Sequence, residues 1–349
     1  MRAPVSVLDT QDMWEATARL PEQVAQAAVD SAMWAGETLL PERERVENIV
    51  VLGMGGSGIA GDVLAAAASP YLSVPVVVVK SYVVPAFVSD SSLVFAISFS
   101  GDTEETVEAV AEAQGAGAKV VVVTGGGELA HFAKRAELPS FTLPDDIPQP
   151  RAALGAMAMP PIFALQAMGF FPGASEWVDQ AVLQLRRRRD EAFRPGSDAE
   201  TVARRIGDTI PLVESSHMLG SAAAQRWKTQ VNENAKRPAF WSMYPELCHN
   251  EVVGWGRPEL SRETLTLVNL RHDHEHPQVA RRVAEVSQLV GSDVSGVVEV
   301  RAQGEGELAQ LLDLMMVGDA VSLHLAAQDG IDPGPVTVLE ELKRRLRRG

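Results

Sequence analysis

A glycine-rich segment lies between a short apolar run, Asn48 to Leu52, and a helical pattern. Its residues, Gly53 to Gly58, read G-M-G-G-S-G and satisfy the G-x-G-x-x-G pattern of dinucleotide-binding proteins. That pattern requires an acidic residue at the end of the next strand, where Val79, Lys80 and Ser81 stand instead. A glycine turn that leads into a helix also binds a single phosphate, because free backbone N–H groups and the helix dipole attract an anion. This segment alone fits both ligands.

A second loop carries three hydroxyl side chains at the end of another predicted strand. Ser98, Ser100 and Thr103 lie in S-F-S-G-D-T-E-E-T, directly before a helix. Loops at the carboxyl edge of a parallel sheet form ligand sites, and together with Ser57 these residues offer neutral donors to phosphate oxygens. The alternative is a helix capping box between residues 102–103 and 105–106. Two hydroxyl-bearing glycine loops on one sheet edge favour phosphate.

Apolar runs that alternate with helical patterns predict the fold class, which is α/β with parallel, doubly wound sheets flanked by helices. The segment Asp145 to Arg151 carries two prolines and no periodicity, so it predicts a linker between domains at 1–153 and 154–349. The expected strands are Asn48 to Leu52, Val74 to Val79, Leu93 to Ser98, Lys119 to Thr124, Pro211 to Val213, Leu265 to Leu270 and Val297 to Val300. The expected helices include Val5 to Leu40, Glu104 to Gln114, Ser175 to Phe193 and Val336 to Leu346.

The composition excludes several classes of protein. A single cysteine, Cys248, rules out an intramolecular disulfide and every zinc pattern built on cysteines. The net charge of −15 argues against nucleic acid as a partner, because binding to a phosphate backbone needs a basic surface. No apolar run has the length of a signal-peptide core or a membrane span, so we expect a cytoplasmic protein with no membrane partner. His131, His217 and His324 are isolated in the sequence and receive no role.

Four segments in combination resemble a known family. They are GMGGSGIAGD, SFSGDTEET, QPRAALG and NENAKRPAFWSMYPELCHNEVVGW. From about Asn48 to the C-terminal LKRRL, the chain resembles the sugar isomerase (SIS) superfamily, and specifically its bifunctional phosphoglucose/phosphomannose isomerases. The resemblance implies two SIS-type domains and an enzyme that interconverts glucose 6-phosphate or mannose 6-phosphate with fructose 6-phosphate, without metal or cofactor. It also implies the phosphate ligands, which are Gly56, Ser57, Ser98, Ser100 and Thr103.

Isomerisation of this kind needs a small set of side chains. Moving a carbonyl between C1 and C2 requires a base for a carbon-bound proton and a cation beside the enediolate oxygens, and ring opening suits a histidine. By resemblance Glu233 is the base, Arg151 steadies the enediolate, and His249 opens the ring from across a homodimer interface. Lys343 matches an active-site lysine of the family. It also lies on an apolar stripe of the last predicted helix, at Val336, Leu339, Leu342 and Leu346.

Two other functions stay open from the residues alone. A sugar-phosphate-sensing SIS protein would keep the phosphate loops without the catalytic set, and an NAD(P)-dependent oxidoreductase would use the glycine loop for a nucleotide. His272, His274 and His276 could bind a metal, but we interpret them as an exposed acidic loop and expect no metal. Relatives that accept both epimers carry a threonine shortly before the lysine; an ungapped register places Val336 there, and Thr337 follows. Dual specificity is therefore a weaker expectation than isomerisation.

Overall fold

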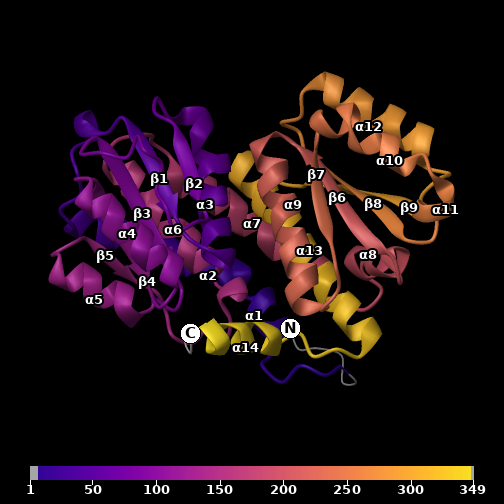
Figure 1. The fold of residues 1–349 in the computed structure, drawn as a ribbon, viewed down its shortest axis with the longest axis horizontal. Helices are drawn as coiled ribbons and strands as arrows, with labels where there is room; N and C mark the ends of the chain where they lie inside the picture. Colours follow the sequence, from indigo (N-terminus) through magenta and orange to yellow (C-terminus); the bar gives the residue numbers. More distant parts are fainter. Residues whose placement is uncertain (1–6, 347–349) are drawn as a thin grey trace.

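The protein is described by a computed structural model that covers residues 7–346, so the predicted helix start at Val5 lies outside the described residues. Two parallel sheets form two lobes (Figure 1). The first lobe holds a five-stranded sheet in the order β2-β1-β3-β4-β5. Four strands lie where the sequence predicts them, whereas β5 is too short to give an apolar run. The strands are β1 (Asn48–Leu52), β2 (Val76–Val79), β3 (Ser92–Ser98), β4 (Lys119–Thr124) and β5 (Ser140–Thr142).

Both faces of the first sheet are covered by helices. Along β1, Ile49 and Val51 belong to one apolar cluster, while Val50 and Leu52 belong to another on the opposite face. Burial on both faces is typical of a parallel sheet, and it confirms the doubly wound α/β fold. One face packs on α4 (Glu104–Gly115) and α5 (Gly127–Arg135). The other packs on α2 (Leu20–Glu37), α3 (Gly55–Ala68) and α6 (Leu154–Ala167).

The second lobe repeats this plan with a four-stranded sheet in the order β7-β6-β8-β9. The edge strand β7 was not expected, because its side chains mix exposed and buried positions without an apolar run. The strands are β6 (Ile210–Ser216), β7 (Phe240–Tyr244), β8 (Leu265–Arg271) and β9 (Gly296–Arg301). The helices of this lobe are α8 (Asp198–Ile206), α9 (His217–Asn234), α10 (Glu251–Trp255), α11 (Pro258–Ser261), α12 (Pro277–Val290) and α13 (Glu307–Asp329).

A layer of helices lies between the two sheets (Figure 1). It contains α9, α13 and α7 (Ala174–Ala192), which belong to the same apolar core as α2, α3 and α6. The helix α6 packs on α2 and α3, so the chain after residue 153 still contributes to the first lobe; the boundary between residues 153 and 154 stays a prediction. Among the described residues, α13 alone has the length and apolar composition of a membrane span, and its apolar stretch of 18 residues is completely buried in this layer.

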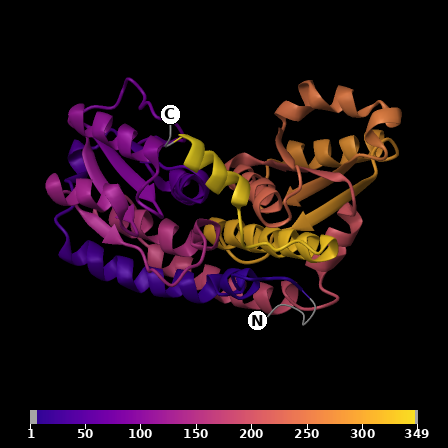
Figure 2. The ribbon, with the colours of Figure 1, turned by 60° about the horizontal axis from the view of Figure 1, so that its bottom comes forward.

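The last helix, α14 (Thr337–Leu346), has no buried residue. It extends toward the first lobe and ends beside it (Figure 2). The predicted apolar stripe is therefore open rather than packed within the chain, with Leu339 45%, Leu342 51% and Leu346 64% exposed. The remaining elements are α1 (Met13–Ala18) and the 3₁₀ turns η1 (Arg43–Arg45), η2 (Ser69–Tyr71), η3 (Pro150–Ala152) and η4 (Glu246–His249).

The two lobes also share the conformation of their first strand-to-helix turn. The helix α3 begins at Gly55 with φ +52°, and α9 begins at His217 with φ +61°. Each helix then carries a glycine against the preceding turn: a Cβ on Gly58 would lie 2.7 Å from the Gly53 oxygen, and one on Gly220 would lie 2.0 Å from the Ser215 Oγ. The structure thus reveals an internal repeat that residue identities do not show.

Candidate active site beside the two predicted phosphate loops

The two predicted phosphate loops lie together where the strand order of the first sheet reverses. The strand β1 has β2 on one side and β3 on the other, and ligands of open parallel sheets bind at the carboxyl edge of such a switch point. The loops hold each other in place. The Phe99 N–H donates to the Ser57 Oγ at 3.3 Å, and the Ser98 Oγ donates to the Thr103 Oγ1 at 3.1 Å. The structure therefore brings the hydroxyls together without assigning them a ligand.

The helix α4 is not capped by a side chain in the way the capping-box alternative requires. Thr103 is its N-cap residue, but its side chain makes no capping hydrogen bond. The Asp102 carboxylate instead accepts from the Glu128 N–H at 3.0 Å. Residue 54, the N-cap of α3, has no capping bond either. Two helix N-termini therefore keep backbone donors available beside the hydroxyl groups, which suits an anion.

The end of β2 carries a cation where a dinucleotide site needs a carboxylate. Lys80 donates to the Asp62 Oδ2 at 2.5 Å and to the Gln225 Oε1 at 2.9 Å. Its side chain also packs against α3, since a Cβ on Gly58 would lie 2.9 Å from the Lys80 Cε. An ammonium cannot accept a hydrogen bond from a ribose hydroxyl. The second strand of the sheet thus does not support nucleotide binding.

Gly56 connects the first phosphate loop to the predicted catalytic arginine. A Cβ at this position would lie 3.0 Å from the Pro150 oxygen and 3.5 Å from the Arg151 nitrogen. Any larger residue would push the loop and the turn η3 apart. The requirement for glycine at this position therefore places Arg151 directly beside the phosphate loop.

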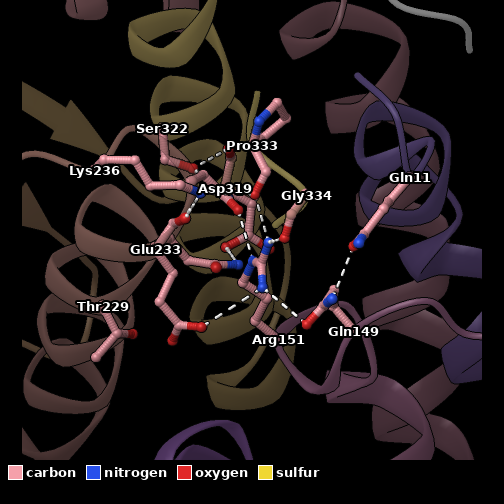
Figure 3. Close-up of polar contacts among 12 residues, drawn as sticks. Gln11, Gln149, Arg151, Thr229, Glu233, Lys236, Asp319, Ser322, Pro333 and Gly334 are labelled. Atoms are coloured by element: carbon pink, nitrogen blue, oxygen red, sulfur yellow. Dashed lines mark hydrogen bonds and ion pairs between the residues drawn. The ribbon is translucent and has the colours of Figure 1, made fainter. Parts of the chain in front are cut away.

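Arg151 is 3% exposed and contacts both lobes (Figure 3). Its Nε donates to the Asn234 Oδ1 at 2.7 Å, while its Nη2 donates to the carbonyl oxygens of Pro333 at 2.5 Å and Gly334 at 2.7 Å. Its Nη1 lies 3.2 Å from the Gln149 Oε1. Because residues 333 and 334 lie shortly before α14, which begins at Thr337, the guanidinium holds the segment that leads into the last helix.

The carboxylate of Glu233 faces this arginine (Figure 3). Its Oε2 lies 3.6 Å from the Arg151 Nη1, and its side chain keeps 26% exposure. Burial lowers the pKa of Arg151, the Glu233 charge raises it, and Arg226 lowers it further. The pair thus combines a solvent-accessible carboxylate with a desolvated cation, which is an arrangement able to move a proton beside a developing oxyanion.

A second cation, Lys236, lies at the same place and was missed by the sequence reasoning. It follows the C-cap residue of α9 and has φ +57°. Its Nζ donates to the Glu233 carbonyl oxygen and, at 3.1 Å, to the Pro333 oxygen. Burial and the nearby Arg151 lower the pKa of Lys236. Its position three residues after Glu233 in the N-E-N-A-K motif was the available signal.

His249 and Lys343 are not brought to this pair within one chain. Glu233 lies at the end of α9, before β7 begins, whereas the exposed His249 lies in η4, after β7 ends. The five residues of β7 separate its two ends by about 17 Å. Lys343 is exposed on α14. Only Glu233 and Arg151 of the four predicted catalytic residues therefore meet in the chain.

Comparison with known proteins identifies the family. The SIS domain family matches residues 44–136, and the family described as bacterial phospho-glucose isomerase C-terminal SIS domain matches residues 196–346. Over 338 residues the chain is 32% identical to the bifunctional phosphoglucose/phosphomannose isomerase of Caldicellulosiruptor bescii, covering 96% of this chain and 98% of that protein. The chain belongs to this family.

Further relatives agree with this phosphoglucose/phosphomannose isomerase family. The bifunctional phosphoglucose/phosphomannose isomerase of Aquifex aeolicus is 37% identical over 309 residues, covering 86% of this chain and 91% of that protein. Among solved structures, the tagatose-6-phosphate ketose/aldose isomerase of Escherichia coli has a TM-score of 0.66 at 15% identity, covering 92% of this chain and 95% of that chain. At this identity the likeness concerns the fold alone.

In this member of the phosphoglucose/phosphomannose isomerase family, the corresponding edge of the second sheet carries imidazoles next to Ser215 and Ser216. The prediction of an exposed loop is wrong for His272, which is 2% exposed and whose Nε2 lies 3.0 Å from the Ser216 oxygen. The supposedly isolated His217 lies beside it, with 6.0 Å between the ring centroids. Within residues 7–346, no group of three or more His, Cys, Asp or Glu side chains is arranged to hold a metal ion. The corresponding edges of the two sheets therefore carry different sets of side chains.

Proposed function

We propose that this protein is an aldose–ketose isomerase that interconverts glucose 6-phosphate, mannose 6-phosphate or both with fructose 6-phosphate through an enediolate. The observation that carries the proposal is the ion pair of Glu233 and Arg151 beside the phosphate loop, where Gly56 contacts the turn that bears the arginine. The curated relatives, which are named for this isomerisation, support it.

The roles of the side chains follow from their chemistry. Ser57, Ser98, Ser100, Thr103 and the backbone at Gly56 hold the phosphate with neutral donors. The Glu233 carboxylate removes a proton from C2 of the aldose and returns it to C1, because it is exposed enough to reach a ligand.

Cations offset the charge that develops on the enediolate oxygens. The Arg151 guanidinium faces Glu233 on one side of the site, and the Lys236 ammonium lies at the end of the same helix as Glu233. This set needs neither a metal nor an organic cofactor.

We also propose that the active enzyme is a homodimer in which His249 of the partner subunit opens the sugar ring. Two observations support this arrangement. His249 is exposed at the opposite end of β7 from Glu233, and apolar side chains are exposed along this stretch of the chain, Phe240 (56%) at the start of β7 and Val253 (78%) in α10 after η4. Lys343 would approach the sugar from α14. A single cysteine, Cys248, fits the cytoplasmic location that we propose.

A coupled assay with glucose 6-phosphate and mannose 6-phosphate, in the presence of a chelator, tests the function. The wild type should turn over at least one substrate, and Glu233→Gln should lose about 10²- to 10⁴-fold in kcat while still binding fructose 6-phosphate. Glu263→Gln, an exposed glutamate outside the site, is the matched control. Binding of the sugar phosphate without turnover in the wild type would indicate a sensor, and a spectral change with a nicotinamide nucleotide would indicate an oxidoreductase.

A further inference from the structure

A row of polar side chains crosses the interior of the second lobe. Glu214 on β6 pairs in register with Ser242 on β7 and with Asn269 on β8, so the three side chains lie on one face of the sheet. They are 1%, 7% and 2% exposed, respectively. The same face carries an apolar cluster that includes Tyr244 and Leu247. A carboxyl group at this depth requires hydrogen-bond partners.

Glu214 has a donor for one oxygen only. Its Oε2 accepts from the Tyr244 hydroxyl at 3.1 Å, whereas its Oε1 and the Oδ1 of the neighbouring Asn269 are both buried without a partner. The two residues are register partners on adjacent strands, whose backbones lie about 4.8 Å apart, and two acceptor oxygens cannot form a hydrogen bond with each other. A proton on the Glu214 Oε1 converts it into a donor for Asn269 and satisfies both atoms. The geometry thus favours a neutral carboxyl.

The charges around this carboxyl favour the same state. Burial raises the pKa of Glu214 to about 8; the Tyr244 hydrogen bond lowers the value, and the charge of Glu251 raises it. Burial raises the pKa of Tyr244 as well, with contributions from Glu214 and from Cys248, opposed by Arg271. The Arg271 guanidinium is itself held by carboxylates at 275 and 299. It therefore pairs with those groups and leaves Glu214 uncompensated when ionised.

The segment that carries His249 is connected to the row of Glu214, Ser242 and Asn269 by a hydrogen bond at each end. Tyr244 is the last residue of β7, and η4 follows within two residues. After η4, the Glu251 carboxylate at the start of α10 accepts a hydrogen bond from the Ser242 hydroxyl. Leu247, in the middle of the segment, is fully buried in the same cluster. The orientation of the exposed His249 is thus determined by the residues beneath it.

We propose that Glu214, in its protonated form, is a positioning residue that holds the His249 segment in its active arrangement through Tyr244. The proposal rests on the ring-opening role proposed for His249. Ionisation of Glu214 removes the donor to Asn269 and leaves a buried charge without a cation, so the end of β7 and the segment after it lose their anchor. Turnover of the cyclic sugar then falls at alkaline pH.

Infrared spectroscopy tests the protonation state without reference to catalysis. The wild type should show the C=O stretch of a buried protonated carboxyl at neutral pH, and the band should disappear with a midpoint near pH 8. It should be absent from Glu214→Gln at every pH. Tyr244→Phe should keep the band, because the carboxyl stays buried. Absence of the band from the wild type at neutral pH would overturn the proposal.

The ratio of kcat/KM at alkaline pH to that at neutral pH tests the link to His249. In the wild type this ratio should fall about tenfold per pH unit above the Glu214 midpoint, and Glu214→Gln, which keeps an acceptor for Tyr244 and a donor for Asn269, should remove that fall. Exposed Glu263→Gln, which lies outside this segment, is the control and should keep the fall. If Glu214→Gln retains the alkaline fall while the infrared band titrates, positioning by Glu214 is refuted and the isomerase function stands. Wild-type activity in His249→Ala would instead refute the role of His249.

Discussion

Replacing Arg151 with lysine keeps the positive charge but removes the planar fork that the site uses. The guanidinium contacts Asn234 through Nε, Glu233 through Nη1 and the carbonyls of residues 333 and 334 through Nη2. A lysine ammonium carries its three donors on one nitrogen, so it cannot reach these opposed acceptors together. Because Arg151 is 3% exposed, an acceptor that loses its donor is not solvated by bulk water.

The expected loss of stability in Arg151→Lys follows from the number of hydrogen bonds that the variant loses. Hydrogen bonds to charged groups contribute about 1.5–3 kcal/mol each, and Arg151→Lys loses at least two, those to Asn234 and to one of the carbonyls. The free energy of unfolding should therefore fall by about 3–6 kcal/mol. Since misplacement of about 1 Å costs roughly a hundredfold in rate, isomerase turnover should fall by about that factor.

Urea unfolding followed by circular dichroism measures the stability, and limited trypsin digestion reports on α14, whose basic residues are Lys343, Arg344 and Arg345. Cleavage there should accelerate, because the variant releases the segment that precedes the helix. Arg204→Lys is the matched control: its side chain is 55% exposed and pairs with Glu200, so it should change stability by less than about 1 kcal/mol. If Arg151→Lys unfolds at the wild-type urea concentration and is cleaved at the wild-type rate, this account of Arg151 is incorrect.

Ser98→Ala removes a proposed phosphate donor and the hydrogen bond to Thr103, so the KM for fructose 6-phosphate should rise about tenfold, equivalent to about 1.4 kcal/mol, in initial-rate measurements. Arg226→Met leaves the buried Asp319 carboxylate without its guanidinium and should cost about 3–5 kcal/mol of unfolding free energy; wild-type urea stability would contradict this. The pKa of Glu214 is raised in the folded state to about 8, so the folded protein binds more protons there than the unfolded chain. Stability should decline from about pH 4.5 to about pH 8, by up to about 1.4 kcal/mol per pH unit relative to Glu214→Gln; parallel profiles of the two proteins would refute the assignment.

The sequence predicted the parts of the fold that depend on local patterns. Continuous apolar runs such as Lys119 to Thr124 identify strands buried on both faces, and the structure confirms that strand with its predicted bounds. Edge strands escape this reasoning, because β5 and β7 bury only part of their surface. The internal repeat could not be predicted from the sequence either. The two lobes share a turn conformation and the order of their first four strands, while their loops carry different side chains.

The candidate site was predictable where motif residues lie close in space within one chain. Glu233 and Arg151, 82 residues apart in the numbering, meet because Gly56 brings η3 against the phosphate loop, which no local pattern reveals. Lys236 was missed because a lysine after a helix is ordinarily solvated, and its contact with the Pro333 carbonyl depends on the path of the distant C-terminal segment. The buried carboxyl of Glu214 was missed for a similar reason, since the residues around it come from three separate strands.

The continuous apolar core between the sheets limits how the molecule can move. Lobes that meet through a small polar surface rotate as hinged domains, whereas a large apolar interface opposes such rotation. Here Leu64 of α3, Trp227 of α9 and Met315 of α13 belong to one buried cluster. The two lobes are therefore not expected to open and close around the substrate by hinged rotation. Any rearrangement around a bound substrate therefore falls to peripheral elements such as α14, which has no buried side chain of its own.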